Sequence, residues 1–160
     1  MSHCAVSQRS TTSISKPVPF QILQLVLTAW AGSLWAICLI VAPSLFVVVA
    51  DRQLAGAIAG HLFRIETWLG LALGGIVLLL LSKSASALRV NTNYVLVTLT
   101  VTAPVSNEVV IRPLMDEARA AGDTRMFGIL HGAGAALLLF ACITVLALVW
   151  RIAAKTQRES

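Results

Sequence analysis

Four ionisable side chains lie at the borders of long apolar stretches in this sequence. His61 and Glu66 precede one stretch, Glu108 closes another, and His131 lies just inside a further one. Imidazole nitrogens bind divalent transition metals, carboxylates can complete such a site, and histidine is an axial ligand of haem iron. His61, Glu108 and His131 are therefore candidate ligands of a metal ion or a haem.

Other polar residues at the same expected depth extend this candidate site to a polar outer cluster. Its further members are Arg64, Glu66, Asn107 and Arg112, and a guanidinium group can neutralise a carboxylate or bind an anionic substrate. A simpler interpretation is that Glu108 pairs with Arg112 and that the histidines reach the lipid headgroups as polar caps. The spacing does not favour a metal site, because the sequence has no HxxxH, HxxE or CxxC motif.

The elements that must position these residues follow from the composition. Hydrophobic residues make up 58% of the 160 residues and charged residues only 12%, whereas globular domains average about half apolar and about a quarter charged. A lipid bilayer must therefore solvate the apolar surface. The net charge is +5, but the basic residues are scattered at segment ends rather than gathered in a patch, so we expect no nucleic-acid partner.

Several apolar stretches are long enough to cross a bilayer. A helix rises about 1.5 Å per residue and needs about 20 residues to cross about 30 Å of hydrocarbon. The stretch 93–111 is rich in Val and Thr, but an open strand cannot cross lipid with unpaired backbone groups, so we expect a helix. The sequence predicts an all-α integral membrane four-helix bundle with spans at about residues 20–50, 54–82, 93–111 and 127–150.

The basic residues also predict the orientation, because Lys and Arg in short loops resist translocation. Both tails and the connection between the second and third spans share one side, which holds seven basic residues: Arg9, Lys16, Lys83, Arg89, Arg151, Lys155 and Arg158. The other side holds five: Arg52, Arg64, Arg112, Arg119 and Arg125. We therefore expect a multi-pass protein of the cell (inner) membrane with both termini in the cytoplasm, N-in and C-in.

Polar segments flank the membrane domain, which we expect to cover residues 20–151. Residues 1–19 are rich in Ser and Thr and lack periodicity, which indicates a disordered cytoplasmic tail, and residues 152–160 form a second tail. After the third span, an Arg-Pro pair followed by two acids predicts a short capped helix at about 113–121 on the outer surface.

The three cysteines show no paired spacing. Cys38 and Cys142 lie inside predicted spans, where a free thiol behaves as a small hydrophobic group, and Cys4 lies in the tail. No disulfide is predicted from this pattern.

Small residues four positions apart predict helix contacts within the membrane. Gly70 with Gly74 and Gly128 with Gly132 form such pairs, which let helix backbones approach closely in lipid. They also suit a homo-oligomer or a membrane-protein partner. Pro104 lies inside the third span and should kink it, and kinks often border cavities.

Two blocks of sequence resemble a known family. The blocks comprise residues 32–35 (GSLW), 42–46 (APSLF), 55–56 (AG) and 62–63 (LF), then Asn107, residues 111–115 (IRPLM) and 127–132 (FGILHG). They are similar to a bacterial membrane family of unknown function related to the eukaryotic transmembrane protein 205 family, over about residues 25–149. The serine usual in that family after the histidine is replaced by Gly132-Ala133-Gly134.

This resemblance implies a four-helix membrane fold but no established activity and no accepted catalytic residues. A looser similarity to the membrane domains of copper-resistance D type proteins would favour metal handling. Three functions stay open: binding a metal ion or haem, transporting a small solute alone or as a subunit, and serving as a structural or assembly partner. Enzymatic activity ranks below these three functions, because the sequence shows no pairing of a nucleophile with a base and no phosphate-binding loop.

Overall fold

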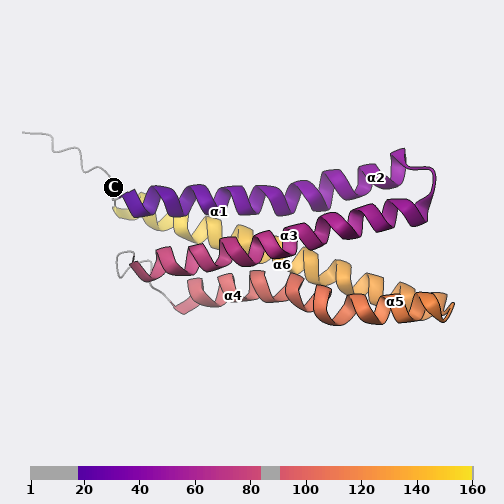
Figure 1. The fold of residues 1–160 in the computed structure, drawn as a ribbon. Coiled ribbons are helices and arrows are strands. Elements are labelled where there is room, and N and C mark those ends of the chain that lie inside the picture. The colour runs from indigo at the N-terminus through magenta and orange to yellow at the C-terminus, as the bar shows by residue number, and fades with distance from the viewer. Residues whose placement is uncertain (1–17, 84–90, 160) are drawn as a thin grey trace, which may run out of the picture.

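A computed structural model describes residues 18–83 and 91–159, with side chains over 21–83 and 91–154. The described chain is helical, with two short π-helical segments among α-helices (Figure 1). The tail expected before the first span lies outside these residues, apart from its last two positions. In chain order the elements are α1 (Val18–Ala36), η1 (Ile37–Val41), α2 (Ala42–Val48), α3 (Arg52–Lys83), α4 (Asn91–Ser106), η2 (Asn107–Ile111), α5 (Arg112–Ala120) and α6 (Thr124–Glu159).

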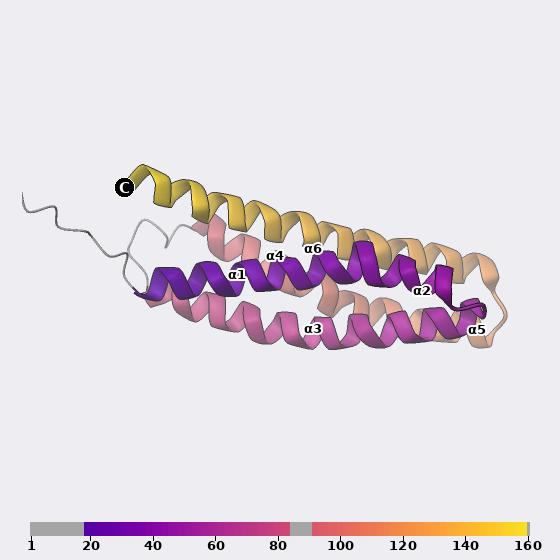
Figure 2. The ribbon, with the colours of Figure 1, turned by 90° about the horizontal axis from the view of Figure 1, so that it is seen from above.

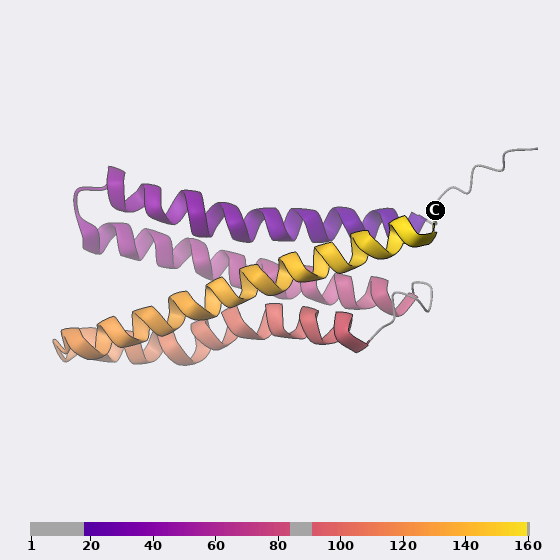
Figure 3. The ribbon, with the colours of Figure 1, turned by 180° about the vertical axis from the view of Figure 1, so that it is seen from behind.

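The helices form two antiparallel hairpins. The first hairpin pairs α1, η1 and α2 with α3, and the second pairs α4, η2 and α5 with α6 (Figures 1 and 2). The start of α1 and the end of α6 lie at one end of the bundle, the terminal end, and connections 49–51 and 121–123 lie at the other, the loop end (Figure 1). Helix α6 crosses the other helices obliquely (Figure 3).

The expectation of four long apolar helices is confirmed. The candidate spans are Gln21–Val48, Arg52–Lys83, Asn91–Ala120 and Thr124–Ala154, which contain 28, 32, 30 and 31 residues. At about 1.5 Å per residue, the longest extends about 48 Å, more than the roughly 30 Å of a hydrocarbon core. Each span therefore has length to project beyond the lipid or to tilt within it.

Acidic side chains and a glycine define the helix boundaries at the loop end. The Asp51 carboxylate accepts hydrogen bonds from the backbone N–H groups of Gln53 at 2.8 Å and Leu54 at 3.3 Å, which caps α3. Asp123 does the same for α6 through the N–H of Met126 at 2.9 Å. Between α5 and α6, Gly122 adopts a φ of 70°, a left-handed conformation that ends a helix and favours glycine.

The third span differs from the sequence expectation at Pro113. A separate surface helix was expected at 113–121, but α4, η2 and α5 run without a break from Asn91 to Ala120. Ile111 and Arg112 both keep right-handed helical backbone angles. The prolyl ring removes one backbone donor and crowds the preceding turn, and the wider π-helical turn just before it accommodates that ring, so the helix continues.

The same arrangement occurs in the first span. Each π-helical segment spans five residues, and a proline follows two positions after its end, at Pro43 and Pro113. Pro104, by contrast, is buried inside α4 with no π-helical turn directly before it, and α4 continues through it to Ser106.

Hydroxyl groups explain how the Val- and Thr-rich third span forms a helix. Thr98 and Thr100 donate to the carbonyl oxygens of Tyr94 and Leu96, four residues earlier, at 2.9 and 2.8 Å. This back-bonding satisfies the hydroxyls without another helix. The Thr100 hydroxyl oxygen also lies 2.9 Å from the Thr144 hydroxyl oxygen of α6, within hydrogen-bond distance, which ties the second hairpin together.

Large apolar side chains fill the bundle toward the terminal end. Trp30 of α1 is only 1% exposed and lies against Gly70 and Gly74 of α3. An added Cβ would lie 3.1 Å from the indole Nε1 at Gly70 and 3.4 Å from the indole ring at Gly74, so the glycines make room for it. The core cluster comprises Leu23, Leu27, Trp30, Ala31, Leu34, Val77, Leu81, Val97, Cys142, Val145, Leu148 and Ile152.

Candidate functional site

Two arginines converge on one carboxylate where the hairpins meet toward the loop end. Arg64 Nε of α3 lies 2.5 Å from Glu108 Oε1, and Arg112 Nη1 lies 3.0 Å from Glu108 Oε2. The Glu108 side chain is 12% exposed and that of Arg64 is 48% exposed. Glu108 belongs to η2, so this ion cluster joins the first hairpin to the second.

Arg112 strengthens the link between the hairpins. The same Nη1 donates a hydrogen bond to the backbone carbonyl oxygen of Gly60 in α3 at 2.9 Å. A Cβ on Gly60 would lie 3.1 Å from the other terminal nitrogen of the guanidinium, so the missing side chain lets Arg112 reach the helix backbone. Charge-assisted hydrogen bonds of this kind are stronger than neutral ones.

Asn107 holds the neighbouring position on the second hairpin. A Cβ added to Gly134 of α6 would lie only 2.5 Å from the Asn107 Oδ1 atom. η2 and α6 therefore approach closely because residue 134 is glycine. Asn107, Glu108 and Arg112 thus occupy one continuous helix with different partners: α6, the Arg64 side chain and the α3 backbone.

Glu66 is the buried acid of the described bundle. It lies near the middle of α3, is 3% exposed, and accepts a hydrogen bond from the Ser33 hydroxyl of α1 at 2.9 Å. Ser33 also contacts the carbonyl oxygen of Trp30 at 2.9 Å. Arg64 is two residues away on α3 but pairs with Glu108 on the second hairpin, so Glu66 faces a different side of the helix.

Neither His61 nor His131 takes part in the ion pairs of this cluster. His61 and His131 are both exposed, and the His131 ring stacks on Phe127 with centroids 6.1 Å apart and an interplanar angle of 12°. Within residues 21–83 and 91–154, no group of three or more His, Cys, Asp or Glu side chains is placed to hold a metal ion. The structure therefore does not bring His61, Glu108 and His131 together.

The glycine pairs expected to pack helices behave differently from each other. Gly70 and Gly74 are buried against Trp30, as described above, and Gly74 also lies against Val101 of α4. Gly128 and Gly132 are exposed, and an added Cβ at either would have nothing within 4 Å. They do not pack within the chain because the outward face of α6 carries them.

Two cysteines meet inside the bundle, a contact that the sequence did not reveal. Cys142 of α6 lies with its Sγ 3.6 Å from Cys38 Sγ of η1, and both are free thiols. The Trp35 indole N–H donates to the carbonyl oxygen of Cys142 at 3.3 Å. Counting residues from the ends of the spans places both cysteines inside the apolar layer, but hydropathy does not show that they face each other.

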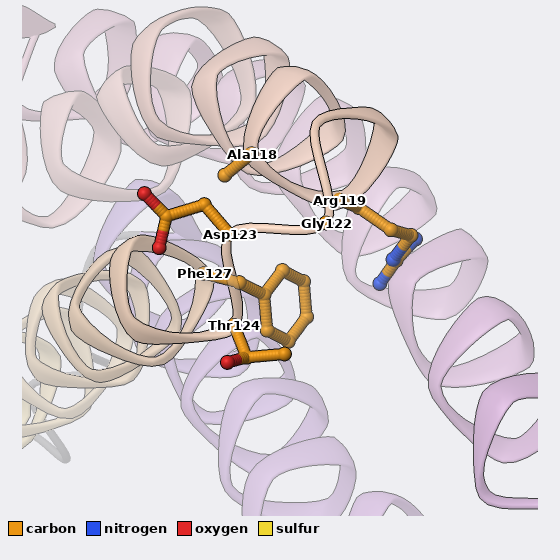
Figure 4. A pocket seen from close by; sticks show the side chains of 6 residues that line it. All are labelled: Ala118, Arg119, Gly122, Asp123, Thr124 and Phe127. Atoms are coloured by element: carbon orange, nitrogen blue, oxygen red, sulfur yellow. The ribbon is translucent and has the colours of Figure 1, made fainter.

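A small pocket lies between α5 and α6 at the loop end (Figure 4). Its volume is about 140 Å³, below the roughly 300–1,000 Å³ of typical ligand sites. The Arg119 guanidinium lies 4.8 Å from the centre of the Phe127 ring, a cation–π contact on its wall. The lining residues are Ala118, Arg119, Gly122, Asp123, Thr124 and Phe127.

The fold and its four candidate spans are those of a multi-pass helical membrane protein. The chain belongs to the family described as Domain of unknown function (DUF4149), whose model matches residues 25–124. The match begins in α1 and ends at the first residue of α6, so it includes Glu66, Glu108 and Arg112. No curated protein and no solved structure matches the chain.

Proposed function

We propose that this protein is a small-solute transporter, or a subunit of one, in the cell (inner) membrane, and that the carboxyl group of Glu66 is its working group. The observation that carries the proposal is the burial of Glu66, which is 3% exposed and has the Ser33 hydroxyl as its hydrogen-bond donor. Holding a carboxylate in an apolar bundle is costly, and such residues mark ion and proton pathways in membrane proteins.

The proposed orientation has both termini in the cytoplasm and the loop end outside. The positive-inside rule supports it, because in sequence all three lysines, at positions 16, 83 and 155, either precede the first span or follow the second and fourth spans. The Arg64–Glu108–Arg112 cluster then lies between Glu66 and the outer surface along the bundle. A solute entering from outside would meet these charges before it reaches the buried carboxyl.

A carboxyl that works in transport must change its protonation state. Infrared spectra of the purified protein in lipid, recorded across a pH titration, should show a protonated-carboxyl band of a buried acid that grows as the pH falls and is lost from Glu66→Gln, while the bands of the six other acidic side chains remain. The matched control is Glu117→Gln, an exposed acid of α5, which should leave the band in place. A Glu66 carboxyl that keeps one protonation state throughout the titration contradicts the proposal.

A solute that binds the bundle should also stabilise it. Thermal unfolding of the wild-type protein against a panel of small anionic and cationic solutes tests this directly, because a ligand at 100 times its Kd adds about 2.7 kcal/mol to the free energy of unfolding. The stabilising solute should lose its effect on Glu66→Gln and keep it on Glu117→Gln. If both variants respond equally, Glu66 is not the working group.

The exposed face of α6 favours a second candidate, an assembly partner. Gly128, Gly132 and Ala136 are exposed and follow one another at four-residue intervals, a spacing that lets a second helix approach closely. The substitutions Gly128→Leu and Gly132→Leu should dissociate an oligomer or a complex in detergent. Ile143→Leu, also on an exposed part of α6, should not. A wild-type protein that is monomeric and partner-free in native membranes contradicts this candidate.

The metal or haem site predicted from His61, Glu108 and His131 is supported less well. Glu108 already pairs with two guanidinium groups, and both histidines are exposed. The related proposal, that the chain is akin to transmembrane protein 205 and copper-resistance D type domains, would favour it. A visible spectrum and metal analysis of protein purified without chelator test it, and a metal lost from both His61→Ala and His131→Ala would establish the site.

A further inference from the structure

The two thiols of the described bundle lie in contact although 104 positions separate them in sequence. Cys142 Sγ is 3.6 Å from Cys38 Sγ, and one residue belongs to the first hairpin and the other to the second. A disulfide requires about 2.0 Å between the sulfurs, so a modest approach of η1 to α6 would allow a bond. The pair therefore meets the first requirement of a redox-active dithiol.

Two features hold this contact in place. Trp35 donates its indole N–H to the carbonyl oxygen of Cys142 at 3.3 Å, from a position one turn before Cys38. Cys38 itself lies in the π-helical segment η1, and π-helical turns inside α-helices occur frequently at functional sites. The backbone thus departs from regular α-helix at the residue that points its sulfur at α6.

The surroundings determine which oxidant can reach the thiols. Cys142 is buried, Cys38 is half-buried, and the flanking Leu39 and Ile40 are exposed. Cys142 lies eight residues before Trp150 in α6, or about 12 Å along the helix, inside a stretch without Asp, Glu, Lys or Arg. A water-soluble oxidant is excluded from such a place, whereas a molecule dissolved in the lipid can approach Cys38.

We infer that Cys38 and Cys142 form a reversible dithiol–disulfide site that is oxidised by a lipid-soluble quinone. Cys38, the more accessible thiol, reacts first, and Cys142 completes the sulfur–sulfur bond. The two S–H bonds break and one S–S bond forms, and the two electrons and two protons that leave the thiols convert the quinone to the quinol. The bond links η1 covalently to α6, and thus one hairpin to the other.

The test uses full-length protein in lipid nanodiscs, with Cys4→Ser so that Cys38 and Cys142 supply all thiols. After reduction, a short-chain ubiquinone is added, quinol formation is followed by absorbance, and remaining thiols are alkylated under denaturing conditions and counted by mass spectrometry. One quinol per protein, loss of both thiols and a mass lower by two hydrogens are expected. A membrane-permeant phosphine should restore both thiols.

Variants identify the residues responsible. Cys38→Ser and Cys142→Ser, added separately, should each lower quinol formation at least tenfold, while Ser44→Ala, on the exposed surface of α2, should not change it. Two alkylated thiols after quinone treatment of the protein without these changes would overturn the inference, and that result does not depend on whether a variant folds. A disulfide between two copies, seen as a dimer on a non-reducing gel, would also overturn it.

Discussion

The terminal half and the loop half of the bundle bury different kinds of side chain. Toward the terminal end, α1 alone contributes Leu23, Leu27, Trp30 and Leu34 to the core. Toward the loop end, the buried hydrophobic residues are alanines, at positions 55, 59 and 118, and the helices meet through the Arg64–Glu108–Arg112 cluster. One half is held by close packing of large groups and the other by small residues and charge.

This difference bears on which half can move. In lipid, helix association depends on van der Waals packing and interhelical hydrogen bonds, because the tails are as apolar as the side chains. A core of interlocking large residues must separate as a unit, whereas an ion cluster with a 48% exposed arginine can exchange its partners for headgroups or water. We therefore expect the hairpins to open first at the loop end.

The largest expected effect on the free energy of unfolding comes from a cavity in the core of the terminal half. Trp30→Ala removes a side chain that is 1% exposed and leaves Gly70 and Gly74 facing a cavity. The free energy of unfolding should fall by about 3–5 kcal/mol, as for other buried aromatic truncations. Unfolding in mixed micelles with increasing SDS measures it. Trp150→Ala, at a residue 77% exposed, is the control, and an equal loss there would contradict the comparison.

Overfilling the same half should cost less. Gly74→Ala places a methyl group against Val101 and Trp30, and overpacking typically costs about 1–3 kcal/mol. Gly75→Ala has open space around its new Cβ and should be neutral or slightly stabilising, because alanine favours helix. The same unfolding assay separates the two. If both variants are neutral, Trp30 does not depend on the missing side chain of Gly74.

Breaking the ion cluster should have a smaller effect that depends on salt. Glu108→Gln leaves Arg64 and Arg112 without a counter-charge, and because Arg64 is largely solvated, we expect a loss of about 1 kcal/mol that shrinks as salt is added. Asp116→Asn, which breaks the exposed pair with Arg119, should change little. A large, salt-independent loss for Glu108→Gln would mean that the loop half is as tightly packed as the terminal half.

The smallest effect tests a polar contact inside the well-packed half. Thr100→Val removes the hydroxyl that is hydrogen-bonded to Thr144 at 2.9 Å, and interhelical hydrogen bonds in membrane proteins average about 0.6 kcal/mol. Thr98→Val removes only a bond to its own helix, at the carbonyl of Tyr94, and serves as the control. A difference well above 1 kcal/mol would show that hydrogen bonding, and not packing alone, holds the terminal half.

Hydropathy predicted the four long helices because length and lack of charge are enough to identify a span. The second span is predicted at about residues 54–82, and the corresponding helix α3 covers Arg52–Lys83. The short helix predicted at about 113–121 lies where the structure has α5 (Arg112–Ala120), but α5 continues α4 because a π-helical turn accommodates the ring of Pro113, and local propensity rules do not describe that compensation. Helix α6 also continues to Glu159, beyond the expected span, since no Gly or Pro follows Trp150 to stop it.

The side-chain partners were harder to predict than the helices. In a soluble helix the polar residues follow one face and identify the opposite face as buried. A span in lipid is apolar on both faces, so the sequence pattern does not predict its rotation about its own axis. The expected depth in the membrane alone placed Arg64, Glu66, Glu108 and Arg112 in one predicted cluster. It could not tell that Glu66 turns to Ser33 while Arg64 turns to Glu108, nor that Cys38 faces Cys142.

The two π-helical segments also set the rotational phase of everything beyond them. A π-helical turn holds one residue more than an α-helical turn, and each α-helical residue advances the helix by about 100°. If Ile37–Val41 were regular α-helix with the same residues, all of α2 (Ala42–Val48) would be turned by about that angle, and the same change in Asn107–Ile111 would turn α5 (Arg112–Ala120). Arg112 would then face away from Gly60. Each π-helical turn thus takes up one extra residue and sets which way the helix after it faces.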